Sequence, residues 1–153
     1  MKVIVCKTTV LTIFSLCLLL SLGCEEENPA TFYLRKWIGV YDGTSRHWST
    51  YPSVVNGNWQ IITNESNRKV TVDVGIGVQD SALNFKITYN DSITSISENL
   101  LFSNEGVHFA QTGGGSGYGS VNIRFVADSL YYSLFQKCGI PCSSGIDFKI
   151  KKI

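Results

Sequence analysis

The feature that most constrains the fold is a two-residue alternation of apolar and polar side chains that recurs along the chain. From Val70 to Val78 every second residue is apolar, and residues 83–90 and 146–151 repeat the pattern. Because successive side chains of a strand point to opposite faces, the alternation predicts antiparallel strands with one buried and one solvated face. It argues against a helix-rich enzyme fold, which would need a sustained period of 3.6 residues.

Turn residues separate the alternating segments. Asn56-Gly57 is a strong hairpin signal, and residues 64–68 are expected to form the next turn. The candidate strand segments, of which 93–102 has the weakest alternation, are residues 35–42, 46–51, 58–63, 69–78, 82–89, 93–102, 106–111, 119–127, 129–136 and 145–152. Turns at this spacing predict an all-β fold, an antiparallel meander of about eight to nine strands that forms a small barrel or a sandwich.

The first 23 residues have the composition of a signal peptide. Lys2 and Lys7 give a positive start, and residues 10–22 are almost wholly apolar. This apolar run has 13 residues, fewer than the roughly 20 that span a bilayer as a helix. Residues 1–23 are therefore expected to be removed from the mature protein.

The end of this segment points to a membrane anchor. Leu20-Ser21-Leu22-Gly23-Cys24 resembles the lipobox of bacterial lipoproteins, with Ser21 where leucine is preferred. The resemblance implies that Cys24 is lipidated and becomes the N-terminus. Lipidation would anchor the protein to a membrane, because two or more acyl chains give stable anchoring where one is marginal. An ordinary cleaved signal and an uncleaved anchor are the alternatives.

An acidic linker follows the cysteine. Glu25-Glu26-Glu27 resembles the acidic tags that export lipoproteins to the outer surface of certain Gram-negative bacteria. The alternative is a solvated spacer on a protein that faces the periplasm. The expected organisation is a signal peptide (1–23), a lipidated linker (24–34) and a β domain (35–153), located at the outer membrane or cell surface.

The charge balance excludes one class of partner. The chain has 13 basic and 12 acidic residues, but loss of Lys2 and Lys7 with the signal leaves 11 against 12, a net charge of −1. Without the three linker glutamates the domain has 11 against 9, or +2. A nucleic-acid-binding protein would carry a larger, clustered basic excess, so no nucleic-acid partner is expected.

Two cysteines remain in the domain, in Cys138-Gly139-Ile140-Pro141-Cys142. An oxidising compartment and an even pair at close spacing predict a disulfide. A redox pair has two intervening residues next to a βαβ pattern, and a zinc site needs about four ligands, so neither is favoured.

The start of the domain carries a second resemblance. Trp37-Ile38-Gly39-Val40-Tyr41-Asp42-Gly43 is similar to the first strand of lipocalin-like and avidin-like barrels, with Trp37, Gly39, Tyr41 and Gly43 on one face. The resemblance implies a barrel and leaves the ligand open.

No enzyme signature emerges from the glycine-rich segment 113–119 or from the histidines. A nucleophile elbow around Ser116 needs glycine at position 118, which is Tyr118. Ser116-Gly117-Tyr118 resembles part of a loop in periplasmic lysozyme inhibitors, which space the tyrosine further along. His47 and His108 are 61 residues apart and have no recognisable catalytic partner in sequence. No catalytic residue, metal site or cofactor is predicted.

Aromatic side chains are the expected binding material, because they pair with sugars and dominate protein interfaces. The candidates are Trp37, Tyr41, Trp48, Tyr51, Trp59 and Tyr118. The sequence thus predicts a lipid-anchored, non-enzymatic envelope protein whose β domain binds an unknown protein, a glycan or a small apolar ligand. The alternatives are a lipocalin-like carrier of small molecules and an envelope enzyme inhibitor or hydrolase.

Overall fold

The computed structural model describes residues 33–79, 81–114, 117–139 and 141–153. The predicted signal peptide, Cys24 and the linker up to residue 32 lie outside these ranges, as does Ser116. Within these ranges, the 3₁₀ turn η1 (Arg35–Trp37) precedes the strands. The strands are β1 (Gly39–Val55), β2 (Asn58–Ile76), β3 (Ala82–Tyr89), β4 (Ser92–Leu101), β5 (Val107–Gly114), β6 (Gly117–Val126), β7 (Ser129–Cys138) and β8 (Ser143–Lys152).

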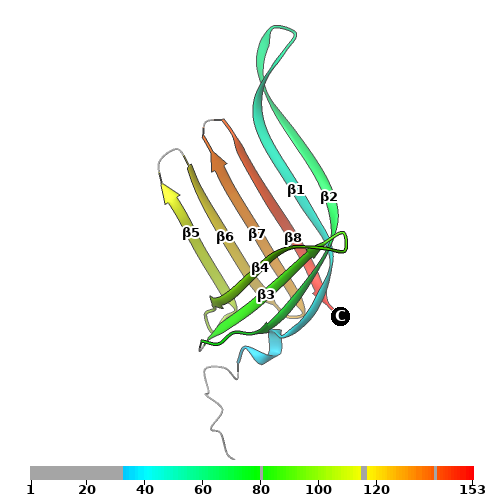
Figure 1. Ribbon diagram of the computed structural model, residues 1–153, viewed down its shortest axis with the longest axis vertical. Helices are drawn as coiled ribbons and strands as arrows, with labels where there is room; N and C mark the ends of the chain where they lie inside the picture. The colour runs from blue at the N-terminus through cyan, green and yellow to red at the C-terminus, as the bar shows by residue number, and fades with distance from the viewer. Residues whose placement is uncertain (1–32, 80, 115–116, 140) are drawn as a thin grey trace, which may run out of the picture.

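The eight strands form one antiparallel sheet in the order β4-β3-β2-β1-β8-β7-β6-β5. Strands that follow each other in sequence pair with each other, except for β4 and β5, which form the two edges of the sheet. β1 also pairs with β8, which joins the two halves of the sheet. The sheet curls into a nearly closed barrel (Figure 1). The all-β meander predicted from the sequence is confirmed, in its barrel form.

Two predicted breaks in the first strands are wrong. Segments 35–42 and 46–51 belong largely to the single strand β1, and segments 58–63 and 69–78 largely to β2. The expected turn at residues 64–68 is continuous ladder, in which Arg68 pairs with Ser45 and Asn64 with Ser49. The polar composition that suggested a turn has another cause. This part of β2 is exposed, so its side chains are solvated.

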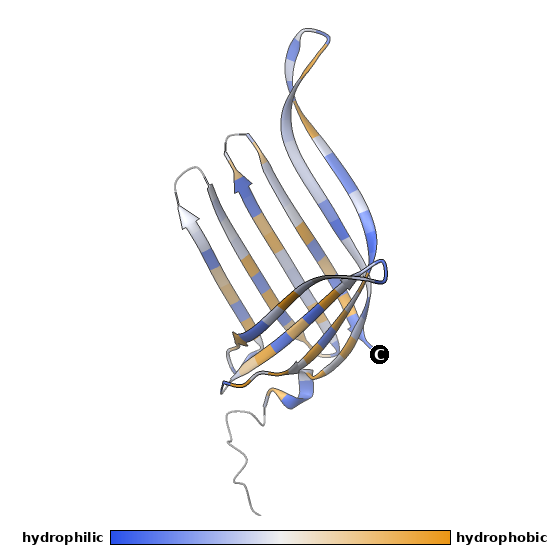
Figure 2. Ribbon diagram, viewed as in Figure 1, coloured by the Kyte–Doolittle hydropathy of each residue, from blue (hydrophilic) through white to orange (hydrophobic). Residues whose placement is uncertain are grey.

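The hydrophobic core lies at one end of the barrel, where β3 and β4 cover the inner face of the sheet (Figure 1). The indole of Trp37 closes this end by stacking on Phe125, with ring centroids 5.1 Å apart. The Tyr41 hydroxyl donates to the Trp37 carbonyl at 2.8 Å, which fixes η1 to the start of β1. Apolar and polar residues alternate along the strands, as predicted (Figure 2).

Beyond the core the sheet is open. β3 pairs with β2 only from Val70 to Ile76, so the preceding part of β2 has no neighbour on that side. The β1–β2 hairpin projects past the other strands (Figure 1). The upper parts of β1, β2 and β5–β8 therefore present an inner face, continuous with the core, and an outer face.

The predicted disulfide is confirmed. Cys138 and Cys142 are bonded, and the Cys138 amide also donates to the Cys142 carbonyl at 3.1 Å. The bridge closes the connection between β7 and β8. Both strands contribute to the surfaces described next.

Candidate functional site: an aromatic and cationic outer face

Three aromatic rings form a continuous line on the outer face, here called the ring strip: Tyr118, Phe135 and Trp48. Ring centroids are 5.5 Å apart for Tyr118 and Phe135 and 6.0 Å apart for Phe135 and Trp48. Gly145 on β8 makes the strip continuous, because a Cβ there would lie 2.6 Å from the Trp48 indole. The rings therefore span the sheet from β6 to β1.

Polar groups hold the Trp48 end of the strip in place. The Trp48 Nε1–H donates to Asp147 at 2.9 Å, and the Ser133 hydroxyl donates to the other oxygen of that carboxylate at 2.7 Å. Arg46 binds Glu65 through two hydrogen bonds of 2.6 and 3.2 Å. Hydrogen bonding to Glu65, and secondarily the negative charge of Glu65, raises the pKa of Arg46. Both carboxylates are thus already bound.

Three cations lie over tyrosine rings on the same face. Arg124 and Lys149 flank Tyr131, with the cationic groups 5.1 and 5.0 Å from the ring centroid. Lys137 lies 5.8 Å from the Tyr118 ring. Among the described residues none of these three cations pairs with a carboxylate. Their charges are therefore available to a ligand.

A broad groove of about 820 Å³ runs beside the ring strip. It is called the outer groove, and its lining includes Arg46, Asn122, Arg124, Tyr131, Asp147 and Lys149. This volume is within the range of small-ligand sites, about 300–1,000 Å³. The groove combines aromatic surface with an excess of positive charge, so it suits an anionic ligand that also presents an apolar face.

The inner face carries a smaller groove of about 330 Å³, whose floor contains His47. The fully buried Ser45 hydroxyl donates to the Arg68 carbonyl at 3.1 Å and lies 3.0 Å from His47 Nε2. Because the single hydroxyl proton of Ser45 is donated to the Arg68 carbonyl, the Ser45 oxygen accepts a hydrogen bond from Nε2–H of His47. Nδ1 of the neutral His47 ring is then unprotonated. Burial, and secondarily the charge of Arg68, lowers the pKa of His47.

The structure separates the six aromatic residues predicted from the sequence. Trp37 and Tyr41 are buried in the core, where no ligand contacts them without unfolding. Trp48 and Tyr118 lie together in the ring strip. The remaining two, on the projecting hairpin, are Tyr51, which accepts a hydrogen bond from Asn64, and Trp59, which is 77% exposed.

Sequence reasoning missed the partners that make the outer face a site. Phe135, Tyr131, Arg124 and Lys149 are not among the candidates predicted from the sequence. A signal for two of them was present, since Tyr131 and Phe135 occupy alternate positions of one strand and so share a face. The cross-strand positions of Arg124 and Lys149, both opposite Tyr131, depend on strand register.

Both histidines face inward. His108 Nδ1 lies 2.8 Å from the Leu101 carbonyl, and its ring is 5.5 Å from that of Phe102. Within the described ranges, neither histidine contacts a carboxylate, and no three His, Cys, Asp or Glu side chains gather as metal ligands would. No helix in these ranges is long and apolar enough to cross a membrane.

Comparison of the chain with protein-family models, with curated protein sequences and with solved structures gives no significant match.

Proposed function

We propose that the protein is a lipid-anchored envelope protein that binds acidic glycan chains, without catalysis, through the outer groove. The observation that carries the proposal is the row of Arg124, Tyr131 and Lys149 across three adjacent strands, on the same face as the ring strip and separated from it by one row of side chains. The antiparallel ladder fixes the backbone that carries these side chains, so binding does not require the backbone to be ordered.

The chemistry of an acidic glycan matches both parts of this surface. Its carboxylates are complementary to Arg124, Lys137 and Lys149, which have no carboxylate partner among the described residues. The apolar faces of its sugar rings are complementary to the exposed aromatic surface of the ring strip. A purely apolar ligand would leave the Arg124 and Lys149 cations of the outer groove without partners, so the groove does not favour a carrier of apolar molecules.

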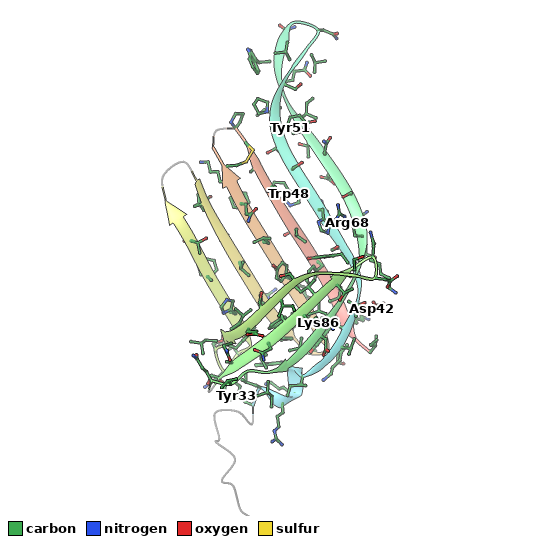
Figure 3. All side chains as sticks on the ribbon, viewed as in Figure 1. Tyr33, Asp42, Trp48, Tyr51, Arg68 and Lys86 are labelled. Atoms are coloured by element: carbon green, nitrogen blue, oxygen red, sulfur yellow. A yellow bond between two sulfur atoms is a disulfide. The ribbon has the colours of Figure 1, made fainter. Side chains whose placement is uncertain are left out.

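The position of the tether supports display of this surface away from a membrane. Tyr33 lies at the core end of the molecule and Tyr51 towards the other end, with Trp48 between them (Figure 3). The nine residues from Cys24 to residue 32 reach at most about 32 Å when extended. β1 alone has 17 residues and a length of about 56 Å. An anchored domain would therefore keep its core end towards the bilayer.

The test compares two polysaccharides and two tryptophan variants. Binding of polygalacturonate and of neutral dextran to the mature protein is measured by titration calorimetry. The Trp48→Leu variant shortens the ring strip, whereas Trp59→Leu removes an exposed indole on the hairpin and serves as the matched control. Circular dichroism checks that each variant is folded.

We expect polygalacturonate to bind and dextran not to bind. Trp48→Leu should weaken the binding at least about fivefold, corresponding to about 1 kcal/mol of lost ring contact, and Trp59→Leu should not change it. Equal binding of the two polysaccharides, or equal effects of the two substitutions, would contradict the proposal. If an acidic envelope protein bound the mature protein more tightly than polygalacturonate does, the partner of the outer groove would be a protein and not a glycan.

A further inference from the structure

The inner groove has a different chemistry from the outer one. Its side chains come from four strands and share the inner face because of the ladder register: His47 lies opposite Ser66 and Ile146, and Ser49 lies opposite Asn64 and Ser144. On β7, Leu134 and Gln136 continue these two rows. One row thus joins two polar side chains, Ser66 and His47, to the apolar Ile146 and Leu134, and the next row is made of hydroxyls and amides.

Most of the polar groups in this groove have no protein partner. Among the described residues, the side chains of Ser49, Ser66, Gln136 and Ser144 form no hydrogen bond within the protein. They provide three hydroxyls and one carboxamide, each of which can both donate and accept. Such a set is complementary to a ligand that carries several hydroxyl groups.

The groove also contains one unpaired positive charge. The Arg68 guanidinium forms no ion pair with a described residue, and the Ser45 hydroxyl holds the Arg68 backbone through its carbonyl. Glu65, which also lines the groove, has its carboxylate bound by Arg46. The net charge available to a ligand is therefore positive and comes from Arg68. Guanidinium groups bind carboxylates through two parallel hydrogen bonds.

We propose that the inner groove binds a single sugar acid, a polyhydroxylated molecule with one carboxylate. Its carboxylate pairs with Arg68, and its hydroxyls bond to the serines and Gln136. Its less polar face packs on Leu134 and on Ile146, of which Ile146 is partly buried against the core. The volume of about 330 Å³ is near the lower limit for ligand sites, which suits one monosaccharide rather than a chain. This site lies on the face opposite the outer groove and does not depend on it.

The experiment measures binding of D-glucuronate and of D-glucose to the mature protein by titration calorimetry. Arg68→Gln removes the charge from the groove, and Arg68→Lys keeps the charge but loses the paired donors. Lys86→Gln, on the outer face of β3 and exposed, is the matched control for loss of one positive charge. Arg68 is also exposed, so its substitution is compatible with folding.

We expect glucuronate to bind at least about tenfold more tightly than glucose, because a charged hydrogen bond contributes roughly 1.5–3 kcal/mol. Arg68→Gln should abolish this preference, Arg68→Lys should retain part of it, and Lys86→Gln should leave it unchanged. Ser144→Leu, which fills the groove, should weaken both sugars. Equal binding of the two sugars, or a glucuronate affinity that Arg68→Gln does not reduce, would overturn the proposal. Polygalacturonate is not used here, so the result does not depend on the outer groove.

Discussion

Gly145 provides a sharp test of how the sheet supports the ring strip. A Cβ at this position would lie 2.6 Å from two atoms of the Trp48 indole and 2.8 Å from the Leu134 carbonyl oxygen. The carbonyl belongs to the β7–β8 ladder and cannot move alone. Gly145→Ala must therefore displace the indole and bend the sheet.

Overpacking of this kind costs about 1–3 kcal/mol. We expect Gly145→Ala to lower the free energy of unfolding by that amount, measured by urea titration of the mature protein with circular dichroism. The variant should also bind polygalacturonate more weakly, because the displaced indole loses its hydrogen bond to Asp147 and its contact with Phe135.

Gly75 gives the matched control. It lies within β2, and a Cβ there would meet nothing within 4 Å. Gly75→Ala should be neutral or stabilise the protein by about 0.4–1 kcal/mol, since alanine reduces the entropy of the unfolded chain. If Gly145→Ala and Gly75→Ala have the same stability, the packing of Trp48 on Gly145 does not support the strip as described.

Three further outcomes follow. Replacing Cys138 and Cys142 by serine should lower the free energy of unfolding by roughly 2 kcal/mol, the chain-entropy value for a five-residue loop; an unchanged urea midpoint would contradict this. Burial, and secondarily Asp128, raises the pKa of Tyr41 to about 12, above the ordinary value near 10. The folded state therefore keeps this proton longer than the unfolded state, so the associated stability is complete below about pH 10 and is lost as the pH rises towards 12. Unfolding followed by circular dichroism should show this loss, and Tyr41→Phe should reduce it. Cys24→Ser should leave the product soluble or uncleaved; unchanged membrane partitioning would refute the anchor.

The local pattern was sufficient to predict much of the core. Alternation placed Val72, Phe85 and Ile87 on a buried face, and all three are buried. The alternation gave a wrong prediction at the end of segment 69–78. Val78 continues the alternation, yet it lies beyond the last residue of β2 and is 92% exposed. Side-chain period predicts which face a residue occupies but not where the sheet that covers that face ends.

The predicted disulfide required only local sequence, since Cys138 and Cys142 are four positions apart. The outer face required knowledge of which strands are neighbours. Trp48 on β1 reaches Phe135 on β7 across β8, and the intervening position is a glycine. The local sequence does not show which strands are neighbours. Trp48 and Tyr118 were therefore predicted as binding residues without Phe135, whose ring lies between theirs.

The most direct test of the central claim is the affinity of the mature protein for polygalacturonate, measured for the native sequence, for the double variant Arg124→Gln/Lys149→Gln and for the control Lys86→Gln. At 50 mM NaCl the double variant should lose at least about tenfold, corresponding to two charged hydrogen bonds made in a partly screened setting. The native affinity should fall towards that of the double variant as NaCl is raised to 500 mM. If the double variant binds as tightly as Lys86→Gln at low salt, the outer groove is not the glycan-binding site.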